Sequence, residues 1–305
     1  IKNDVRSYKN AHHTPKVIYD GINRKKRTII VPKYTEQIVH HMVTQKLVPI
    51  FSKGMYEHSY GSLPNRGAHK GKKYIEKWIR QDPKNCKYVL KMDIRKFFDS
   101  IPHDILKEKL ARIIKDEKFI KVLFEIIDVQ GVGLPLGFYT SQWIANWYLQ
   151  ELDHYIKEEL KAVYYVRYMD DFILIHEDKE YLHYCLKKIK RFLRKIHLEI
   201  SPKKTHIFKI TQPIRFLGFS FKLHETGKVT WKLYNDNIKT ERRKLVKQIQ
   251  RVSMGLMTMH EFEECYQSWR AFAKKSDSRG RILKMDKYKN RLKENYYDSH
   301  QKRKC

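Results

Sequence analysis

Long hydrophobic runs are missing from this sequence of 305 residues. No apolar stretch approaches the roughly 18 residues that a transmembrane helix requires, and no signal-peptide pattern opens the chain, so we expect a cytoplasmic protein. Cysteine is also scarce. The four cysteines are far apart and show no C-x-x-C spacing, which argues against zinc sites and disulfide frameworks.

Acidic residues are few compared with basic ones. The chain carries 64 Lys and Arg against 34 Asp and Glu, a formal net charge of +30. A positive field of this size favours a polyanionic partner, most commonly nucleic acid. A highly charged soluble surface and a membrane-surface protein are the alternatives. The 20 Tyr, 14 Phe and 5 Trp interleaved with the charge favour nucleic acid, because bases stack on aromatic side chains.

The sequence does contain an apolar hairpin pattern with two acids at its centre. Residues 164–175 read YYVRYMDDFILI, two runs rich in β-branched and aromatic residues around Asp170 and Asp171. Neighbouring side chains point to opposite faces of a straight strand, so both acids can serve one site only at a turn. Solvated turn residues are the simpler interpretation. The apolar flanks favour a buried pair, which needs a cation or a raised pKa.

A second strand-like run, KYVLKMDI at residues 87–94, ends at Asp93. Paired strands lie about 4.8 Å apart, so Asp93 is expected to face Asp170 across a metal ion. Three acids on a sheet that hold two Mg²⁺ ions, or Mn²⁺ in their place, form a phosphoryl-transfer site.

Together these motifs resemble those of bacterial and phage reverse transcriptases. YMDD at 168–171 resembles the metal-binding box of that family, and DIRKFF at 93–98 resembles the aspartate motif before it. Three further boxes follow in the family's order: GLPLGFYTSQ at 133–142, KKT at 203–205 and FLGF at 216–219. The resemblance covers about residues 25 to 235.

This resemblance implies an α+β fold, the right-hand polymerase fold of fingers, palm and thumb. Fingers with a basic N-terminal segment are expected over 1–85, and a palm with an antiparallel sheet over 86–222. The palm range includes fingers and palm helices at 103–130, and a helical thumb with a basic tail is expected over 223–305. The implied activity is that of an RNA-directed DNA polymerase, which adds dNTPs to a DNA or RNA primer on an RNA template.

The resemblance also assigns the catalytic residues. Asp93, Ile94, Asp170 and Asp171 form the expected metal site, and the three aspartates carry the catalysis. Lys204 matches the lysine that protonates the pyrophosphate leaving group, and a surface lysine is the alternative interpretation of this residue.

Five residues are expected to contact the incoming nucleotide: Lys25, Arg27, Phe98, Leu136 and Gly137. Lys25 and Arg27 lie in a basic loop that resembles the fingers hairpin holding the triphosphate. Phe98 matches the steric gate that crowds a ribose 2′-OH, which implies a preference for dNTPs. Leu136 stands where the family usually has Gln, and leucine cannot donate hydrogen bonds, so looser control of base pairing is expected unless Leu136 merely packs.

Nine residues are expected to contact the template or primer: Arg66, Gly67, Ser141, Gln142, Tyr168, Met169, Phe216, Leu217 and Gly218. Arg66 and Gly67 belong to a glycine-punctuated basic loop that can approach phosphates closely. Gly218, in the segment that resembles the primer grip, allows the backbone to approach a primer strand.

Leu136 and Gln142 together match the variant box of diversity-generating retroelement reverse transcriptases, within the group II intron-like superfamily. This implies error-prone synthesis, mainly at template adenines, with a structured non-coding RNA and a small basic accessory protein as partners. An antiphage defence or abortive-infection reverse transcriptase is the alternative enzyme. Retrons are disfavoured because 210–212 is a poor match to their VTG-like segment. A non-catalytic RNA-binding protein is the alternative of a different class, which the intact acids disfavour.

Apolar periodicity predicts the helices. A helix over 36–51 is expected to turn its apolar residues toward the core: Ile38, Val39, Met42, Val43 and Leu47. One long helix is expected to run from Thr140 or Ser141 as its cap through Ile156. Three basic helices are expected at 238–252, 259–273 and 281–296.

Overall fold

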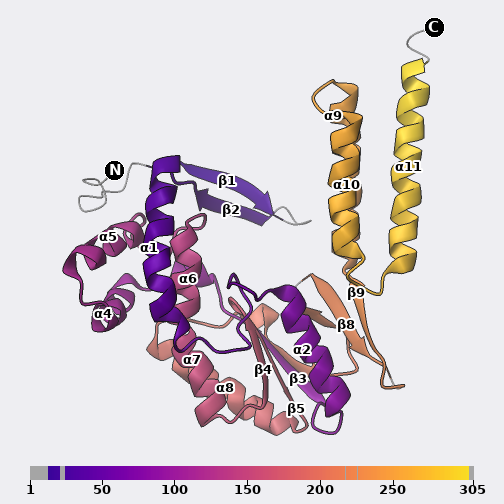
Figure 1. The fold of residues 1–305 in the computed structure, drawn as a ribbon. Helices are drawn as coiled ribbons and strands as arrows, with labels where there is room; N and C mark the ends of the chain where they lie inside the picture. The colour runs from indigo at the N-terminus through magenta and orange to yellow at the C-terminus, as the bar shows by residue number, and fades with distance from the viewer. Residues whose placement is uncertain (1–12, 21–24, 217, 225, 302–305) are drawn as a thin grey trace. The chain divides into compact units, whose positions relative to one another are not determined.

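The computed structural model describes residues 13–20, 25–216, 218–224 and 226–301 (Figure 1). These residues form two compact units. One comprises the chain up to Ile18 together with Arg27–Ile210, and the other comprises Tyr19–Lys26 together with the chain from Thr211 onward. No helix in the described part of the chain is both long enough and apolar enough to cross a membrane.

The first unit is built on a four-stranded antiparallel sheet with the strand order β4-β5-β3-β6. Its strands are β3 (Tyr88–Asp93), β4 (Tyr164–Tyr168), β5 (Asp171–His176) and β6 (His206–Lys209). The hairpin predicted from residues 164–175 is confirmed as β4 and β5, and the predicted strand that ends at Asp93 is confirmed as β3. Their apolar runs are continuous because helices cover the sheet and bury these strands.

Helices surround this sheet, and a small sheet of β1 (Pro15–Asp20) and β2 (Lys25–Ile30) precedes them. The helices are α1 (Tyr34–Ser52), α2 (Ala68–Gln81), α3 (Phe97–Ser100), α4 (His103–Ile113), α5 (Glu117–Ile127), α6 (Tyr139–Tyr148), α7 (Gln150–His154), the π-helix η1 (Tyr155–Glu159), α8 (Lys179–Lys195) and the 3₁₀ turn η2 (Pro202–Lys204). α8 packs against β3, β5 and β6, α2 packs against β4, and α1 lies along α6 (Figure 1).

Two predicted helices are present, but details of each prediction were wrong. In α1 the buried side carries Val43 and Leu47, whereas Ile38 is 41% exposed and Met42 43% exposed. The apolar residues of α1 lie on more than one side of the helix, so periodicity alone did not identify the buried side.

The long helix expected through Ile156 is in fact divided into α6, α7 and η1. α6 begins at Tyr139 with Phe138 as its N-cap, which makes no side-chain capping bond. Thr140 and Ser141 are therefore buried residues of the first turn rather than caps.

The second unit contains a three-stranded antiparallel sheet and three helices. The strands are β7 (Ile214–Phe216), β8 (Phe219–Leu223) and β9 (Val229–Leu233), and the helices are α9 (Asn235–Ser253), α10 (Met259–Ala273) and α11 (Arg279–Gln301). α9 packs against both α10 and α11 around a core that includes Leu245, Phe262 and Met285. The three predicted basic helices are confirmed, and Thr258 with Glu261 forms a capping box that starts α10.

Candidate active site

The turn between β4 and β5 presents the two adjacent acids. Tyr168 pairs with Asp171 across the hairpin, which leaves Met169 and Asp170 as the turn residues. Met169 has a φ of 54°, a left-handed conformation that costs a residue with a side chain about 1–2 kcal/mol. The amide of Ile94 donates to the carbonyl of Asp170 at 3.1 Å, and this bond fixes the turn against the end of β3.

Antiparallel pairing of β3 with β5 places Asp93 directly opposite Asp171. Side chains of directly opposed residues lie on the same face of a sheet, so these two carboxylates are neighbours. The sequence predicted that Asp93 would face Asp170. The register pairs Asp93 with Asp171 and puts Asp170 in the adjoining turn, where the charge of Asp93 acts on it. That Asp93 and Asp170 face one another across a metal ion stays a prediction.

The acids are electrostatically coupled. Burial, and then the negative charge of Asp93, raise the pKa of Asp170 above its ordinary value, while Lys204 and Arg27 oppose that rise. Burial also raises the pKa of Asp171 to about 6, against the opposing effect of Lys91. The pKa values of both acids are therefore raised chiefly because their carboxylates are removed from water.

Two lysines contact these carboxylates. The Lys204 Nζ donates to Asp93 Oδ2 at 2.6 Å, and the Lys91 Nζ donates to Asp171 Oδ2 at 3.2 Å. The structure thus brings Lys204 into the predicted site, although its catalytic role remains a prediction. Lys91 was missed. Its signal in the sequence was its position two residues before Asp93, which places both side chains on one face of the strand.

The donor set suits a hard divalent cation, because carboxylate oxygens are the ligands that Mg²⁺ prefers. Asp171 Oδ1 is buried and has no hydrogen-bond partner, and a cation would satisfy it. Within the described ranges no three Asp, Glu, His or Cys side chains already converge as a metal cluster, since Asp93 and Asp171 each face a lysine instead. The side chain of Ile94 is apolar and buried, so only its carbonyl remains as a ligand.

The residues expected to bind a nucleotide lie on three segments, and their joint role stays a prediction. Arg27, on β2, lies close enough to Asp170 to lower its pKa. The Leu136 carbonyl accepts a hydrogen bond from the Ile30 amide at 2.7 Å, which joins the loop carrying Gly137 to the end of β2. Phe98 is half-buried and follows β3. The side chain of Lys25 lies outside the described residues.

The residues expected to contact template have varied surroundings. Arg66 donates to the carbonyls of Tyr56 and Ser59, so its guanidinium already holds the shape of its own loop. Gly67 has a φ of 135° and is the N-cap of α2. Tyr168 is half-buried. A template contact for Arg66, Gly67 and Tyr168 remains a prediction.

Burial further separates the residues expected to contact template or primer. Ser141, Met169 and Phe216 are buried, whereas Gln142 is exposed. Gly218, with a φ of 82°, accepts a hydrogen bond at its carbonyl from Asn237. Leu217 lies outside the described residues. The roles of these residues also remain predictions.

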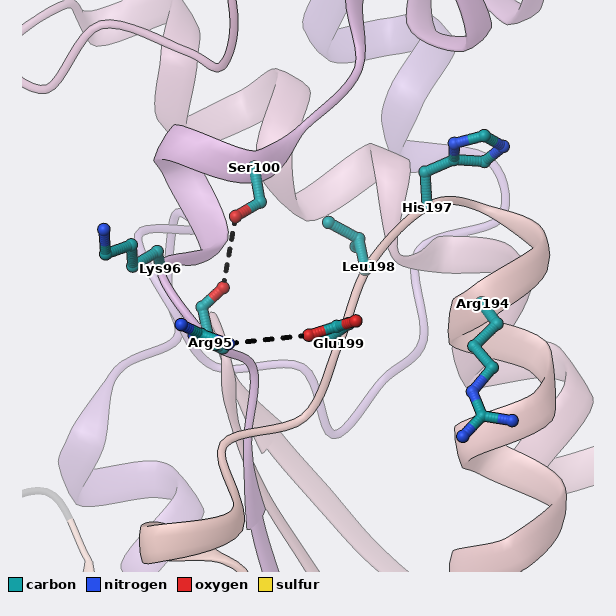
Figure 2. Close-up of a pocket in the computed structure, with 7 residues that line it drawn as sticks. All are labelled: Arg95, Lys96, Ser100, Arg194, His197, Leu198 and Glu199. Carbon is teal, nitrogen blue, oxygen red and sulfur yellow. Dashed lines mark hydrogen bonds and ion pairs between the residues drawn. The ribbon is translucent and has the colours of Figure 1, made fainter.

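A hollow of about 470 Å³ lies beside the segment that follows β3 and is lined by Arg95, Lys96, Arg194, His197 and Glu199, among others (Figure 2). The Arg95 amide donates to the Glu199 carbonyl at 2.7 Å, so the two sides of the hollow are joined next to Asp93. Basic side chains outnumber Glu199 in this lining, and Arg95 pairs with Glu199 at 3.8 Å.

Sequence reasoning missed a buried polar network beneath the turn. Arg167, the fourth of the five residues of β4, pairs with Asp153 of α7 at 2.5 Å, and both side chains are fully buried. Arg167 also bonds to Asn146 of α6. The available signal was an arginine inside an otherwise apolar strand, because a buried charge requires a partner.

The family model for reverse transcriptase (RNA-dependent DNA polymerase) matches residues 13–221. The chain belongs to the reverse transcriptase family. The group II intron-encoded protein LtrA of Lactococcus lactis is 23% identical to it over 307 aligned positions, covering 75% of this chain and 51% of LtrA. The chain therefore spans about half the length of that relative.

Two Escherichia coli proteins also match this reverse transcriptase. The retron Ec73 reverse transcriptase is 28% identical, with 60% of each protein covered. Protein YkfC is 22% identical, with 68% of this chain and 67% of YkfC covered.

Solved telomerase structures share the fold. A Candida albicans telomerase in complex with a fragment of telomeric RNA superimposes with a TM-score of 0.57 at 13% identity, covering 80% of this chain and 52% of that one. A Candida tropicalis telomerase complex gives 0.55 at 15% identity, covering 97% and 55%. The predicted polymerase fold, mixed helix and antiparallel sheet, is confirmed.

Proposed function

We propose that this chain is an RNA-directed DNA polymerase that adds dNTPs to a primer on an RNA template. The observation that carries the proposal is the placement of Asp93 opposite Asp171, with Asp170 in the adjoining turn, inside a chain of the reverse transcriptase family. Burial, and to a smaller extent their mutual repulsion, raise the pKa values of Asp170 and Asp171, and perturbed pKa values of this kind are typical of functional sites.

In this proposal Asp93, Asp170 and Asp171 hold two Mg²⁺ ions, with Ile94 contributing its carbonyl. When bound, the ions supply charge stabilisation at the attacking and leaving oxygens of an in-line displacement. Lys204 carries a proton at its Nζ beside Asp93, where it can be given to the pyrophosphate leaving group. Phe98 excludes the 2′-OH of a ribonucleotide, and Arg27 with Lys25 binds the triphosphate.

We assign fingers to residues 1–85, palm to 86–222 and thumb to 223–305. The net charge of +30 and the basic helices of the second unit suit an RNA template paired with a DNA or RNA primer. The finer assignment is to the diversity-generating retroelement type, with a structured RNA and a small basic protein as partners. It is supported by Leu136 and Gln142, which replace the usual Gln and Pro of the family box.

Primer extension on a primed RNA template tests the activity. Asp93→Asn and Asp170→Asn should abolish Mg²⁺-dependent synthesis while the far-UV circular dichroism stays unchanged, because Asn keeps the shape and loses the charge. Glu177→Gln is the matched control, since this acid follows β5 but pairs with Lys87 at the surface. Wild-type rates in either aspartate variant would disprove the metal assignment. RNA binding without any synthesis by the wild type would favour a non-catalytic RNA-binding protein.

A further inference from the structure

Arg167 is fully buried, and every N–H group of its guanidinium donates a hydrogen bond. Its Nε donates to both carboxylate oxygens of Asp153, at 2.8 and 3.0 Å. One terminal nitrogen donates to Asp153 and to the Asn146 carbonyl, and the other to Asn146 Oδ1 and to the Met169 carbonyl. All five N–H groups of the guanidinium therefore have acceptors. A lysine, with a single compact ammonium, cannot reach all of these acceptors together.

The Met169 carbonyl connects this network to the acids, because Met169 directly precedes Asp170. The bond from Arg167 to the Met169 carbonyl, at 3.3 Å, reaches the turn that carries Asp170. Met169 is in the left-handed conformation, which persists only where neighbouring groups hold it. Arg167 is one such group.

A second contact, from the loop that contains Gly61, is made to the Met169 side chain. A Cβ placed on Gly61 would lie 2.6 Å from the Met169 side chain, so the loop containing Gly61 passes very close to the turn. Asn146 Nδ2 donates to the Gly61 carbonyl at 2.7 Å and so fixes that loop to the same network. Arg167 thus contacts the turn directly, and Asn146 acts on it through the Gly61 loop.

We propose that Arg167 is a positioning residue for the metal-binding turn, with Asp153 and Asn146 fixing its orientation. The inference rests on the proposed function, because it assigns Arg167 to the arrangement of the acids that would bind metal. A role in stability alone explains the network less well. A buried ion pair can often be replaced by apolar residues of similar volume without loss of stability, so stability does not require an arginine whose fifth N–H points to the turn.

Two substitutions separate positioning from stability. Arg167→Lys keeps the charge next to Asp153 and loses the fork of donors. The double variant Arg167→Met with Asp153→Leu removes both charges and fills the space with apolar groups, so it is expected to fold even if Arg167→Lys does not. Arg270→Lys is the matched control, because Arg270 makes a similar two-bonded pair with Asp286, between α10 and α11.

Two readouts follow the turn without any enzymatic assay. The first is the affinity for Mn²⁺, measured from the electron paramagnetic resonance signal of the free ion. The second is hydrogen exchange of the Ile94 amide, resolved by ¹⁵N-isoleucine labelling, since that amide is protected by the Asp170 carbonyl. We expect both Arg167 variants to bind Mn²⁺ about tenfold more weakly and to exchange the Ile94 amide about tenfold faster, the effect of one hydrogen bond to a charged group. Arg270→Lys should leave both unchanged.

Wild-type Mn²⁺ affinity and wild-type Ile94 exchange in a folded Arg167 variant would overturn the inference. Failure of the proposed function has a different signature. In that case the wild type and Asp170→Asn bind Mn²⁺ equally weakly, while faster Ile94 exchange in the Arg167 variants still shows that Arg167 holds the turn.

Discussion

Asp153 and Asp171 are both buried acids, but the fold treats them differently. Asp153 is fully enclosed and receives hydrogen bonds from Arg167 and from the Tyr165 hydroxyl. Asp171 has one lysine contact and one buried oxygen without a partner, and burial raises its pKa to about 6. The carboxylate of Asp153 is fully hydrogen-bonded within the protein, whereas that of Asp171 has an oxygen that could accept a further ligand, as the proposed metal site requires.

The same contrast appears in apolar pairs near the site. Phe97 is 2% exposed and belongs to the core, while its neighbour Phe98 is only partly buried. Leu134 is 1% exposed, while Leu136, two residues later, is half-buried. In each pair one side chain is buried in the core, and the other is partly exposed to solvent. The partly exposed residues, Phe98 and Leu136, are the ones that the sequence motifs assign to nucleotide binding.

The largest effect on the free energy of unfolding is expected from breaking the buried pair of Arg167 and Asp153. Asp153→Asn leaves the Arg167 charge buried without a counterion, which should reduce the free energy of unfolding by about 3–5 kcal/mol. Urea denaturation followed by circular dichroism measures this. The exposed-acid variant Glu177→Gln should change the free energy of unfolding by less than about 0.5 kcal/mol. A loss from Asp153→Asn as small as that of the control would mean that the pair contributes nothing to the fold.

At Asp171 we expect the charged carboxylate to lower the free energy of unfolding, whereas the charge of Asp153 raises it. Its folded pKa of about 6 lies above its ordinary value of 3.8, so the folded state binds the proton more tightly than the unfolded chain. Stability of the metal-free protein should therefore fall as pH rises from about 4 to about 6, by up to ~3 kcal/mol from this group.

Asp171→Asn removes that contribution, and the difference between the variant and the wild type isolates it from the other acids. The variant should thus be the more stable protein at pH 7 without metal, and Mg²⁺ should stabilise only the wild type. The comparison between Asp153 and Asp171 fails if urea denaturation gives the two proteins parallel stability curves between pH 4 and pH 7.

The sequence predicted the parts of the site that local pattern specifies. Apolar runs on both sides of Asp170 and Asp171 predicted the hairpin, and a strand ending at Asp93 was equally clear. The Arg167 network could not be predicted, because its partners Asp153 and Asn146 come from helices whose packing is not visible in local periodicity. The exposure of Ile38 and Met42 was not predicted for the same reason, because the sequence does not show which apolar side chains other elements cover.

A smaller effect is expected at the phenylalanine pair, as a loss of selectivity. Phe98→Ala should open space beside the sugar and improve ribonucleotide incorporation by roughly 10- to 200-fold relative to dNTPs, the range for a change in apolar packing at a pocket. Extension assays with each nucleotide class measure the ratio. Phe97→Ala is the control: it should cost about 3–5 kcal/mol of stability and leave the ratio unchanged. An unchanged preference in Phe98→Ala would reduce Phe98 to a second core residue.

The smallest effect is expected at Leu136 and concerns fidelity. A glutamine at this position could donate a hydrogen bond to the incoming nucleotide, and one such bond is worth about 0.5–1.5 kcal/mol, up to about tenfold in discrimination. Leu136→Gln should therefore lower misincorporation, chiefly opposite template adenine, without a comparable loss of synthesis. Sequencing of cDNA made by both proteins on one RNA template gives the error spectra.

Leu136→Met separates hydrogen bonding from packing in this experiment, because methionine keeps the apolar volume and adds no donor. Its error spectrum should match that of the wild type. If Leu136→Gln and Leu136→Met give the same spectrum, a hydrogen-bond donor at this position does not affect fidelity. The contrast with Leu134 would then be one of exposure alone, and the physical support for the diversity-generating type over a defence reverse transcriptase would be lost.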